Sequence, residues 1–141
     1  MQPVLLDSSV YIAAMRRGDD AILELRRFSG APLWLSAVVL EELYAGASDV
    51  ARQPIERLER AFGGSKQILV PNLDDWTQAG RVLARLAAKY HYETIGRGRL
   101  TNDTLIAMSA ARTGVTVITA NKRDFARLAE FRSFSWELSV L

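Results

Sequence analysis

PVLLDSS, residues 3–9, is a short run of apolar side chains that ends in an aspartate and two serines. A continuous apolar run is typical of a β-strand covered on both faces, as in a parallel sheet. Asp7 then stands at the carboxyl end of the strand, which faces the ligand crevice in open α/β sheets. The stretch predicts an α/β fold and a functional Asp7, although an Asx-turn or a helix cap would also account for this aspartate.

A second apolar, β-branched strand is predicted at residues 115–119, and the segment ANKRDF, residues 120–125, follows it. If the two strands are parallel, this segment lies at the same edge of the sheet as Asp7. Asn121 is a candidate cap of the next helix. Asp124 is either a first-turn acid of that helix or another carboxylate at the edge.

Strand and helix patterns alternate along the rest of the chain, which favours a mostly parallel sheet with helices on both faces. With 141 residues, 49% of them hydrophobic, the chain is long enough for one globular domain with its own core. Further helices are expected at residues 10–17, from 19, and at 37–47, 49–62 and 72–89, with strands at 33–35 and 67–70 and an edge strand at 133–141.

LTNDTLIAMSAA, residues 100–111, is predicted to begin a helix with Thr101 or Asn102 as its N-cap. Asp103 then shares one helical face with three apolar residues, namely Ile106, Ala107 and Ala110. The acid either complements the helix dipole in the first turn or is a carboxylate aimed into a pocket.

The helix at residues 37–47 carries two consecutive glutamates, Glu41 and Glu42, which point about 100° apart. Periodicity alone does not choose between them, and both would be at home on a solvated helix face. Small neighbours of Glu42, including Gly46, would let another backbone or a ligand approach it.

The composition excludes several kinds of site. With no cysteine and one histidine, the chain has no disulfide, no thiolate nucleophile and no site that needs two histidine ligands. It also lacks an apolar run of the roughly 18–20 residues that span a membrane, and its first residues do not resemble a signal peptide. A net charge of +2 is too small to name a partner.

Arg97 and Arg99, in the segment 90–99, form either a cationic lip for a phosphodiester strand or a solvated loop.

Carboxylates gathered at one edge of a sheet would repel one another and raise each other's pKa values unless a cation were present. Carboxylate and water oxygens suit Mg²⁺ or Mn²⁺. Such an ion lowers the pKa of bound water and stabilises charge on a reacting phosphodiester. A hydrolase of this kind needs neither histidine nor cysteine.

Four segments in this order resemble the PIN-domain nucleases, and within them the VapC-type toxins of bacterial toxin–antitoxin pairs: DSSVYI at 7–12, SAVVLEELYAG at 36–46, NDTLIAMSA at 102–110 and TANKRDF at 119–125. The resemblance covers essentially the whole chain. It implies a single PIN-like domain over residues 1–141, a three-layer α/β/α fold with a sheet of about five strands, and Mg²⁺- or Mn²⁺-dependent cleavage of single-stranded RNA. It further implies a cytoplasmic protein with a cognate antitoxin, and members are often homodimers.

The resemblance also assigns roles to residues. Asp7, Glu42 and Asp103 match the first three acids of the family, and the E-L-x-x-G pattern selects Glu42 over Glu41. Many members have aspartate where this chain has Asn121, so either Asn121 acts as a neutral oxygen ligand or Asp124 serves instead. The expected metal ligands are Asp7, Asp103, Glu42 and Asn121; the expected catalytic residues are Asp7, Glu42, Asp103 and Asp124; the expected substrate contacts are Ser9, Arg97 and Arg99.

Three other functions fit parts of the pattern. One is a housekeeping RNA-processing nuclease of the same fold, which would have no antitoxin gene beside it. Another is a catalytically silent RNA- or protein-binding module, for which Asn121 leaves room. A phosphoacceptor domain would need an aspartate at the end of its third strand, where this chain has Pro71 and Asn72. Neither the RNA target and cut position nor the number of metal ions follows from the sequence.

Overall fold

The computed structural model describes residues 2–18, 30–91 and 97–139, without the side chains of residues 97–99. The helix expected from residue 19 lies outside these ranges. No helix in the described residues is long and apolar enough to cross a membrane.

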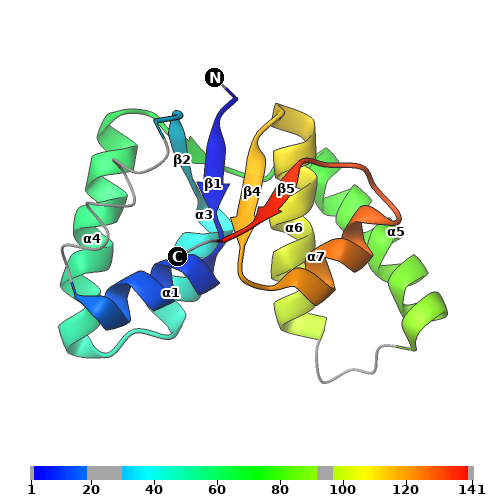
Figure 1. The fold of residues 1–141 in the computed structure, drawn as a ribbon, viewed down its shortest axis with the longest axis horizontal. Coiled ribbons are helices and arrows are strands. Elements are labelled where there is room, and N and C mark those ends of the chain that lie inside the picture. Colours follow the sequence, from blue (N-terminus) through cyan, green and yellow to red (C-terminus); the bar gives the residue numbers. More distant parts are fainter. Residues whose placement is uncertain (1, 19–29, 92–96, 140–141) are drawn as a thin grey trace.

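A five-stranded sheet forms the centre of the fold, and every pair of neighbouring strands is parallel (Figure 1). The strand order is β3-β2-β1-β4-β5. The strands are β1 (Val4–Leu6), β2 (Leu33–Ser36), β3 (Ile68–Leu69), β4 (Thr116–Thr119) and β5 (Trp136–Leu138). The parallel sheet predicted from the apolar runs is confirmed, and Leu5 of β1 and Val117 of β4 are fully buried, as strands covered on both faces require.

The described helices are α1 (Ser8–Arg17), α3 (Ala37–Ala45), α4 (Asp49–Gly64), α5 (Leu73–Tyr90), α6 (Arg97–Thr113) and α7 (Lys122–Ala129). The chain moves outward from β1 through β2 to β3, then crosses back to β4 and β5. Since crossovers between parallel strands are right-handed, the two directions place helices on opposite faces and produce three layers. The direction changes between β1 and β4, so a crevice is expected at their carboxyl ends.

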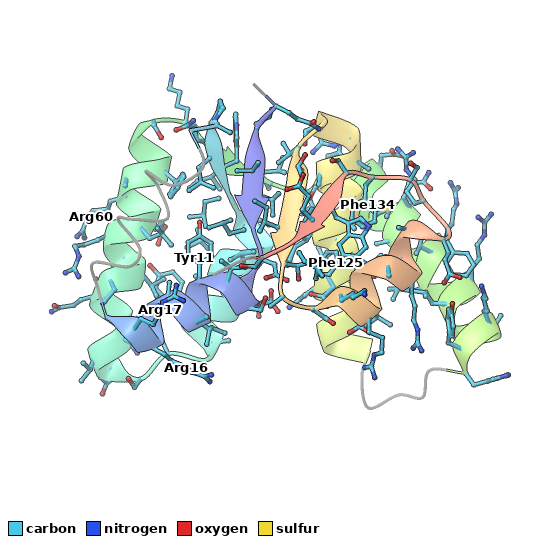
Figure 2. The ribbon with its side chains drawn as sticks, viewed as in Figure 1. Tyr11, Arg16, Arg17, Arg60, Phe125 and Phe134 are labelled. Carbon is cyan, nitrogen blue, oxygen red and sulfur yellow. The ribbon has the colours of Figure 1, made fainter. Side chains whose placement is uncertain are left out.

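Helix α6 supplies much of the core. Ile106, Ala107 and Ala110 are fully buried, which confirms the apolar face predicted for this helix. Phe125 of α7 is also fully buried and packs edge-to-face on Phe134, with ring centroids 6.2 Å apart (Figure 2). The helix that carries Asp103 is thus fixed rigidly against the sheet.

Two predicted boundaries are wrong. Helix α6 begins at Arg97, so neither Thr101 nor Asn102 is its N-cap and residues 97–99 are helical. The physical reason is Leu100, which is 6% exposed and extends the apolar face one turn back. The last strand is shorter than the expected residues 133–141, since β5 covers only Trp136–Leu138, and Leu138 is 45% exposed because β5 is the outermost strand.

An ion pair between buried Asp75 and the partly exposed side chain of Arg112 links α5 to α6. Asp75 is 1% exposed, and both of its carboxylate oxygens accept from Nε of Arg112 at 3.0 Å. The same carboxylate completes a capping box with Asn72 at the start of α5. Nη2 of Arg112 also donates to the carbonyl of Val70, which follows β3, at 3.3 Å. The pair holds the far end of α6 against β3 and α5.

We predict that Arg112→Ala lowers the free energy of unfolding by about 2 kcal/mol, because the Asp75 carboxylate loses its charged hydrogen-bond donor. Urea unfolding measures the change. Arg52→Ala is the control, since Arg52 pairs with Asp49 at 3.5 Å on an exposed surface and should cost less than about 1 kcal/mol. Equal losses in the two variants would contradict a structural role for the Asp75–Arg112 pair.

Candidate functional site at the carboxyl edge of the sheet

Asp7 follows β1 and is only 3% exposed. It is the N-cap of α1, where its Oδ1 accepts from the backbone N–H of Ser9 at 3.1 Å. The helix-cap interpretation of Asp7 is therefore correct. The cap lies at the change of strand direction between β1 and β4, so the same carboxylate also lies where a crevice is expected.

Two hydroxyl groups hold the Asp7 carboxylate from either side. Ser9 donates to Oδ1, and Thr119, the last residue of β4, donates to Oδ2. Each hydroxyl oxygen in turn accepts from the turn after β4, Ser9 from Ala120 N at 3.2 Å and Thr119 from Asn121 N at 2.9 Å. Asp7 is thereby fixed to the loop that carries Asn121.

Thr119 had not been singled out as a site residue in the sequence. The signal was present, since it is a hydroxyl residue at the last position of a buried strand and begins the TANKRDF segment. Ser9, which the sequence did select, lies against Asp7 and acts on it directly.

Glu42 lies on α3 beside Asp7 and is partly buried. Burial raises its pKa, the negative charges of Asp7 and Glu41 raise it further, and the side chains of Ser8 and Asn102 lower it. Its Oε1 atom is buried and has no hydrogen-bond partner among the residues that the structure describes. An unpaired buried carboxylate oxygen is costly, so this atom is suited to a cation or a donor from outside the chain.

Burial also raises the pKa of Asp7, against the hydrogen bonds from Ser9, Thr119 and Val10 that lower it. Two carboxyl groups that interact electrostatically thus both have raised pKa values. Glu41, by contrast, is exposed, and its Oε2 accepts from the side-chain amide of Asn102 at 3.0 Å. Of the two consecutive glutamates, Glu42 is the one near Asp7.

Asp103 is 5% exposed and lies in the second turn of α6, because the helix starts at Arg97. It is therefore not the first-turn dipole partner considered above. Nδ2 of Asn121 donates to Oδ2 of Asp103 at 3.3 Å and to Oδ2 of Asp124 at 3.0 Å. Asn121 also caps α7 as predicted, with Oδ1 accepting from Asp124 N at 3.4 Å. One neutral amide bridges two carboxylates.

The predicted residues therefore fall into two connected groups. Asp7 and Glu42 form one, and Asp103, Asn121 and Asp124 form the other; the bond from Asn121 N to Thr119 joins them. The side chains of these residues end in carboxylate groups or an amide, and their oxygen atoms are ligands that Mg²⁺ and Mn²⁺ prefer. Within the described part of the chain, no group of three or more histidine or acidic side chains is arranged to hold a metal ion. The side chains of Arg97 and Arg99 lie outside the described residues.

A pocket opens beside Glu42 between α1, α3 and α4. It has an apolar lining with one acid and one base, formed by Ile12, Met15, Arg16, Glu42, Leu43, Gly46, Ala47, Ala51 and Ile55. Gly46 lies at its edge, and no side chain crowds the position of a Cβ there. The small residues around Glu42 thus leave the open space that the sequence predicted.

This fold and site define the class of protein. Residues 4–131 match the model of the PIN domain, and the chain belongs to that family. It is 27% identical over 138 residues to the tRNA(fMet)-specific endonuclease VapC of Shigella flexneri, a match that covers 96% of this chain and 99% of the relative.

Solved structures share the fold. DNA-bound VapBC from Salmonella typhimurium superposes with a TM-score of 0.70 at 23% identity over 98% of both chains. VapBC2 from Rickettsia felis, bound to a promoter DNA fragment, superposes with a TM-score of 0.68 at 21% identity, covering 98% of this chain and 99% of that one. FitAcB from Neisseria gonorrhoeae superposes with a TM-score of 0.63 at 20% identity, covering 94% of this chain and 95% of that one.

The raised carboxyl pKa values predict how stability depends on pH in the metal-free protein. Between the ordinary glutamate pKa of 4.5 and the raised value of Glu42, this carboxyl group binds more protons in the folded state than in the unfolded state. Its contribution to the free energy of unfolding therefore increases as the pH falls from neutrality into this window. Glu42→Gln should raise the melting temperature at pH 7 in EDTA and flatten this increase.

Thermal unfolding between pH 4.5 and 8 measures the effect, with Glu137→Gln on the exposed edge strand as the control. If Glu42→Gln instead lowers the melting temperature of the metal-free protein at neutral pH, the Glu42 carboxylate is stabilised by a partner and the prediction is wrong.

Proposed function

We propose that this chain is a divalent-metal-dependent endoribonuclease that cuts single-stranded RNA and serves as the toxin of a toxin–antitoxin pair. The observation that carries the proposal is the pair of linked acidic groups at the carboxyl ends of β1 and β4, Asp7 with Glu42 and Asp103 with Asn121, together with Oε1 of Glu42, which is unpaired among the described residues. Membership of the PIN-domain family and the likeness to a tRNA-specific endonuclease support it.

In this proposal Asp7, Asp103 and Glu42 would hold the divalent ion. The ion would lower the pKa of water and stabilise the charge that develops on the phosphodiester. Ser9 and Thr119 fix the orientation of the Asp7 carboxylate, so that little reorganisation is needed when substrate binds. Asn121 contributes a neutral amide where a fourth carboxylate would add another negative charge. Asp124 accepts a hydrogen bond from this amide.

The antitoxin is proposed as the partner because the related structures are VapBC and FitAB complexes. The pocket between α1, α3 and α4 suits an apolar segment with a basic side chain, since its lining is largely apolar and Glu42 lies within it. An occupant would cover Glu42 and thereby block the site. A homodimer and a cytoplasmic location remain expectations from the family resemblance.

We predict that Asp7→Asn and Asp103→Asn each reduce RNA cleavage by at least about 100-fold, because each removes a charged ligand from the edge. Cleavage of a fluorescent single-stranded RNA in Mg²⁺ or Mn²⁺, and its loss in EDTA, is the measurement. Asp74→Asn, an exposed change of the same kind at the start of α5, should retain full activity.

Calorimetric titration with Mn²⁺ gives a second readout, in which both site variants should bind the ion more weakly than Asp74→Asn. If wild-type protein neither binds Mn²⁺ nor cuts RNA, the silent-module alternative replaces the nuclease.

A prediction for the partner concerns Ile12, which lines the pocket and is 40% exposed. Ile12→Lys should weaken binding of the antitoxin encoded beside this gene by about 10-fold or more, since it places a charge in the apolar part of the interface. Leu73→Lys, a 79%-exposed leucine on α5, is the control. Affinity is measured by calorimetry on the purified proteins, and the absence of any such neighbouring partner would favour the housekeeping nuclease.

A further inference from the structure

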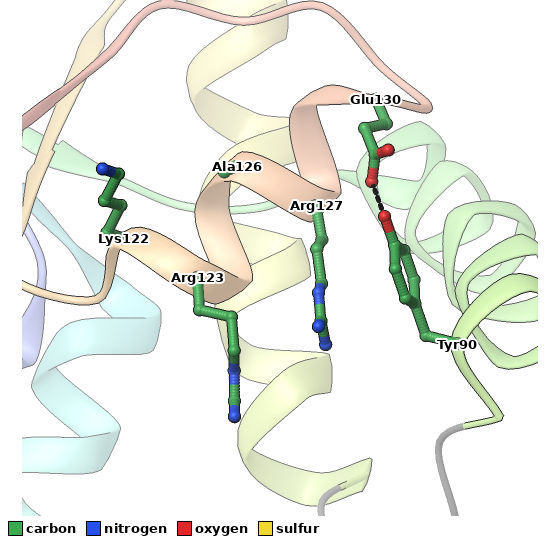
Figure 3. Close-up of a pocket in the computed structure, with 6 residues that line it drawn as sticks. All are labelled: Tyr90, Lys122, Arg123, Ala126, Arg127 and Glu130. Atoms are coloured by element: carbon green, nitrogen blue, oxygen red, sulfur yellow. Dashed lines mark hydrogen bonds between the residues drawn. The ribbon is translucent and has the colours of Figure 1, made fainter.

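A shallow pocket of about 610 Å³ lies on the outer side of α7, next to the acidic residues. It is lined by Tyr90, Lys122, Arg123, Ala126, Arg127 and Glu130, four of them from α7 and Glu130 from its C-cap (Figure 3). Arg123 and Arg127 lie one helical turn apart, about 6 Å along the axis. Ala126 lies between them in sequence and keeps the floor of the pocket open.

The one acid in the lining is neutralised from outside the pocket. Nζ of Lys89 lies 2.6 Å from Oε1 of Glu130, and the hydroxyl of Tyr90 donates to the other carboxylate oxygen. Lys122 is exposed at the start of α7, and its ammonium group forms no ion pair among the described residues. Arg123 lies 3.4 Å from Asp124, with 72% of its side chain exposed. The pocket therefore retains an excess of positive charge that faces solvent.

The wall formed by Tyr90 holds a guanidinium in place. The Cζ atom of Arg127 lies 4.2 Å from the centre of the Tyr90 ring, a cation–π contact, and Figure 3 shows the two side chains side by side. The bond from Tyr90 to Glu130 fixes the ring in turn. A planar cation on an aromatic ring is an arrangement that proteins use against the bases of single-stranded nucleic acids.

The position of the pocket relative to the acids identifies what it would bind. Asn121 caps α7 and Asp124 lies in its first turn, and the pocket extends from that turn along the helix to its C-cap, Glu130. A strand with one phosphodiester at the acidic edge would continue over Lys122 and Arg123. The excess charge suits phosphates, and the ring and the alanine suit a sugar or a base.

We infer that this pocket binds the RNA strand beside the phosphodiester that is cut. Lys122 and Arg123 contact its phosphates, and the Arg127–Tyr90 pair contacts a base. The inference rests on the proposed function, which supplies the RNA and the position of the cut. It assigns these side chains to substrate binding.

The test is fluorescence anisotropy of a short unstructured RNA in EDTA, which prevents metal-dependent cleavage, between about 50 and 200 mM KCl. Lys122→Gln/Arg123→Gln should weaken binding roughly 10-fold and lower the slope of log K against log salt by about 1.4, since each lost contact with single-stranded RNA contributes about 0.7. Tyr90→Leu should weaken binding with little change in slope, whereas Tyr90→Phe keeps the ring and should bind almost normally.

Arg60→Gln/Lys66→Gln is the matched control, because it removes the same charge from exposed residues; Arg60 lies on α4, away from α7 (Figure 2). A polyglutamate peptide of equal charge is the second ligand. If the pocket variant and the control weaken RNA binding equally, or if polyglutamate shows the same losses as RNA, the pocket is not a strand-binding site and the inference is overturned.

These outcomes are separable from a failure of the proposed function. Wild-type protein that cuts RNA, together with a pocket variant that binds it normally, overturns the pocket alone. Wild-type protein that neither binds nor cuts RNA overturns the proposed function and this inference with it.

Discussion

The structure depends on the way one buried carboxylate is held where the sheet changes direction. Asp7 caps α1, yet it is also bound by hydroxyls of Ser9 and Thr119, which in turn accept from the loop after β4. This network fixes the end of β1 to the loop that carries Asn121 and so to the second group of acids. Burial still raises the pKa of Asp7 despite these bonds. The edge is therefore rigid in its backbone and electrostatically unsatisfied.

The two groups of acids differ in how the repulsion between their carboxylates is reduced. Asp103 and Asp124 share the neutral amide of Asn121, which donates to both. Glu42 has no such neighbour for Oε1 within the described chain, and Asp7 and Glu41 raise its pKa further. A divalent cation would favour the charged forms of these carboxylates. An antitoxin side chain reaching Glu42 through the apolar pocket would act on the same charge.

Much of this arrangement could be predicted from the sequence, because strand burial and helix periodicity are local signals. The apolar run before Asp7 and the β-branched run before Thr119 predicted a parallel sheet, and the position after each strand predicted the shared edge. The start of α6 could not be predicted in this way, since Leu100 extends the helix only because the tertiary core accepts it. The Tyr90–Arg127 contact could not be predicted either, since it joins residues far apart in the chain. Thr119 stands at the end of a predicted strand, but its bond to Asp7 joins β4 to the end of β1 and is not a local signal.

If Asp7, Glu42 and Asp103 share one hard cation at the carboxyl edge of the sheet, a crystal structure of the wild-type protein with Mn²⁺ should locate that ion by anomalous scattering. We expect one Mn²⁺ bound by carboxylate oxygens of Asp7 and Asp103, with Glu42 on the ion or on its water. An ion bound elsewhere, or an ordered edge with its carboxylates turned apart and no ion at saturating Mn²⁺, would contradict it.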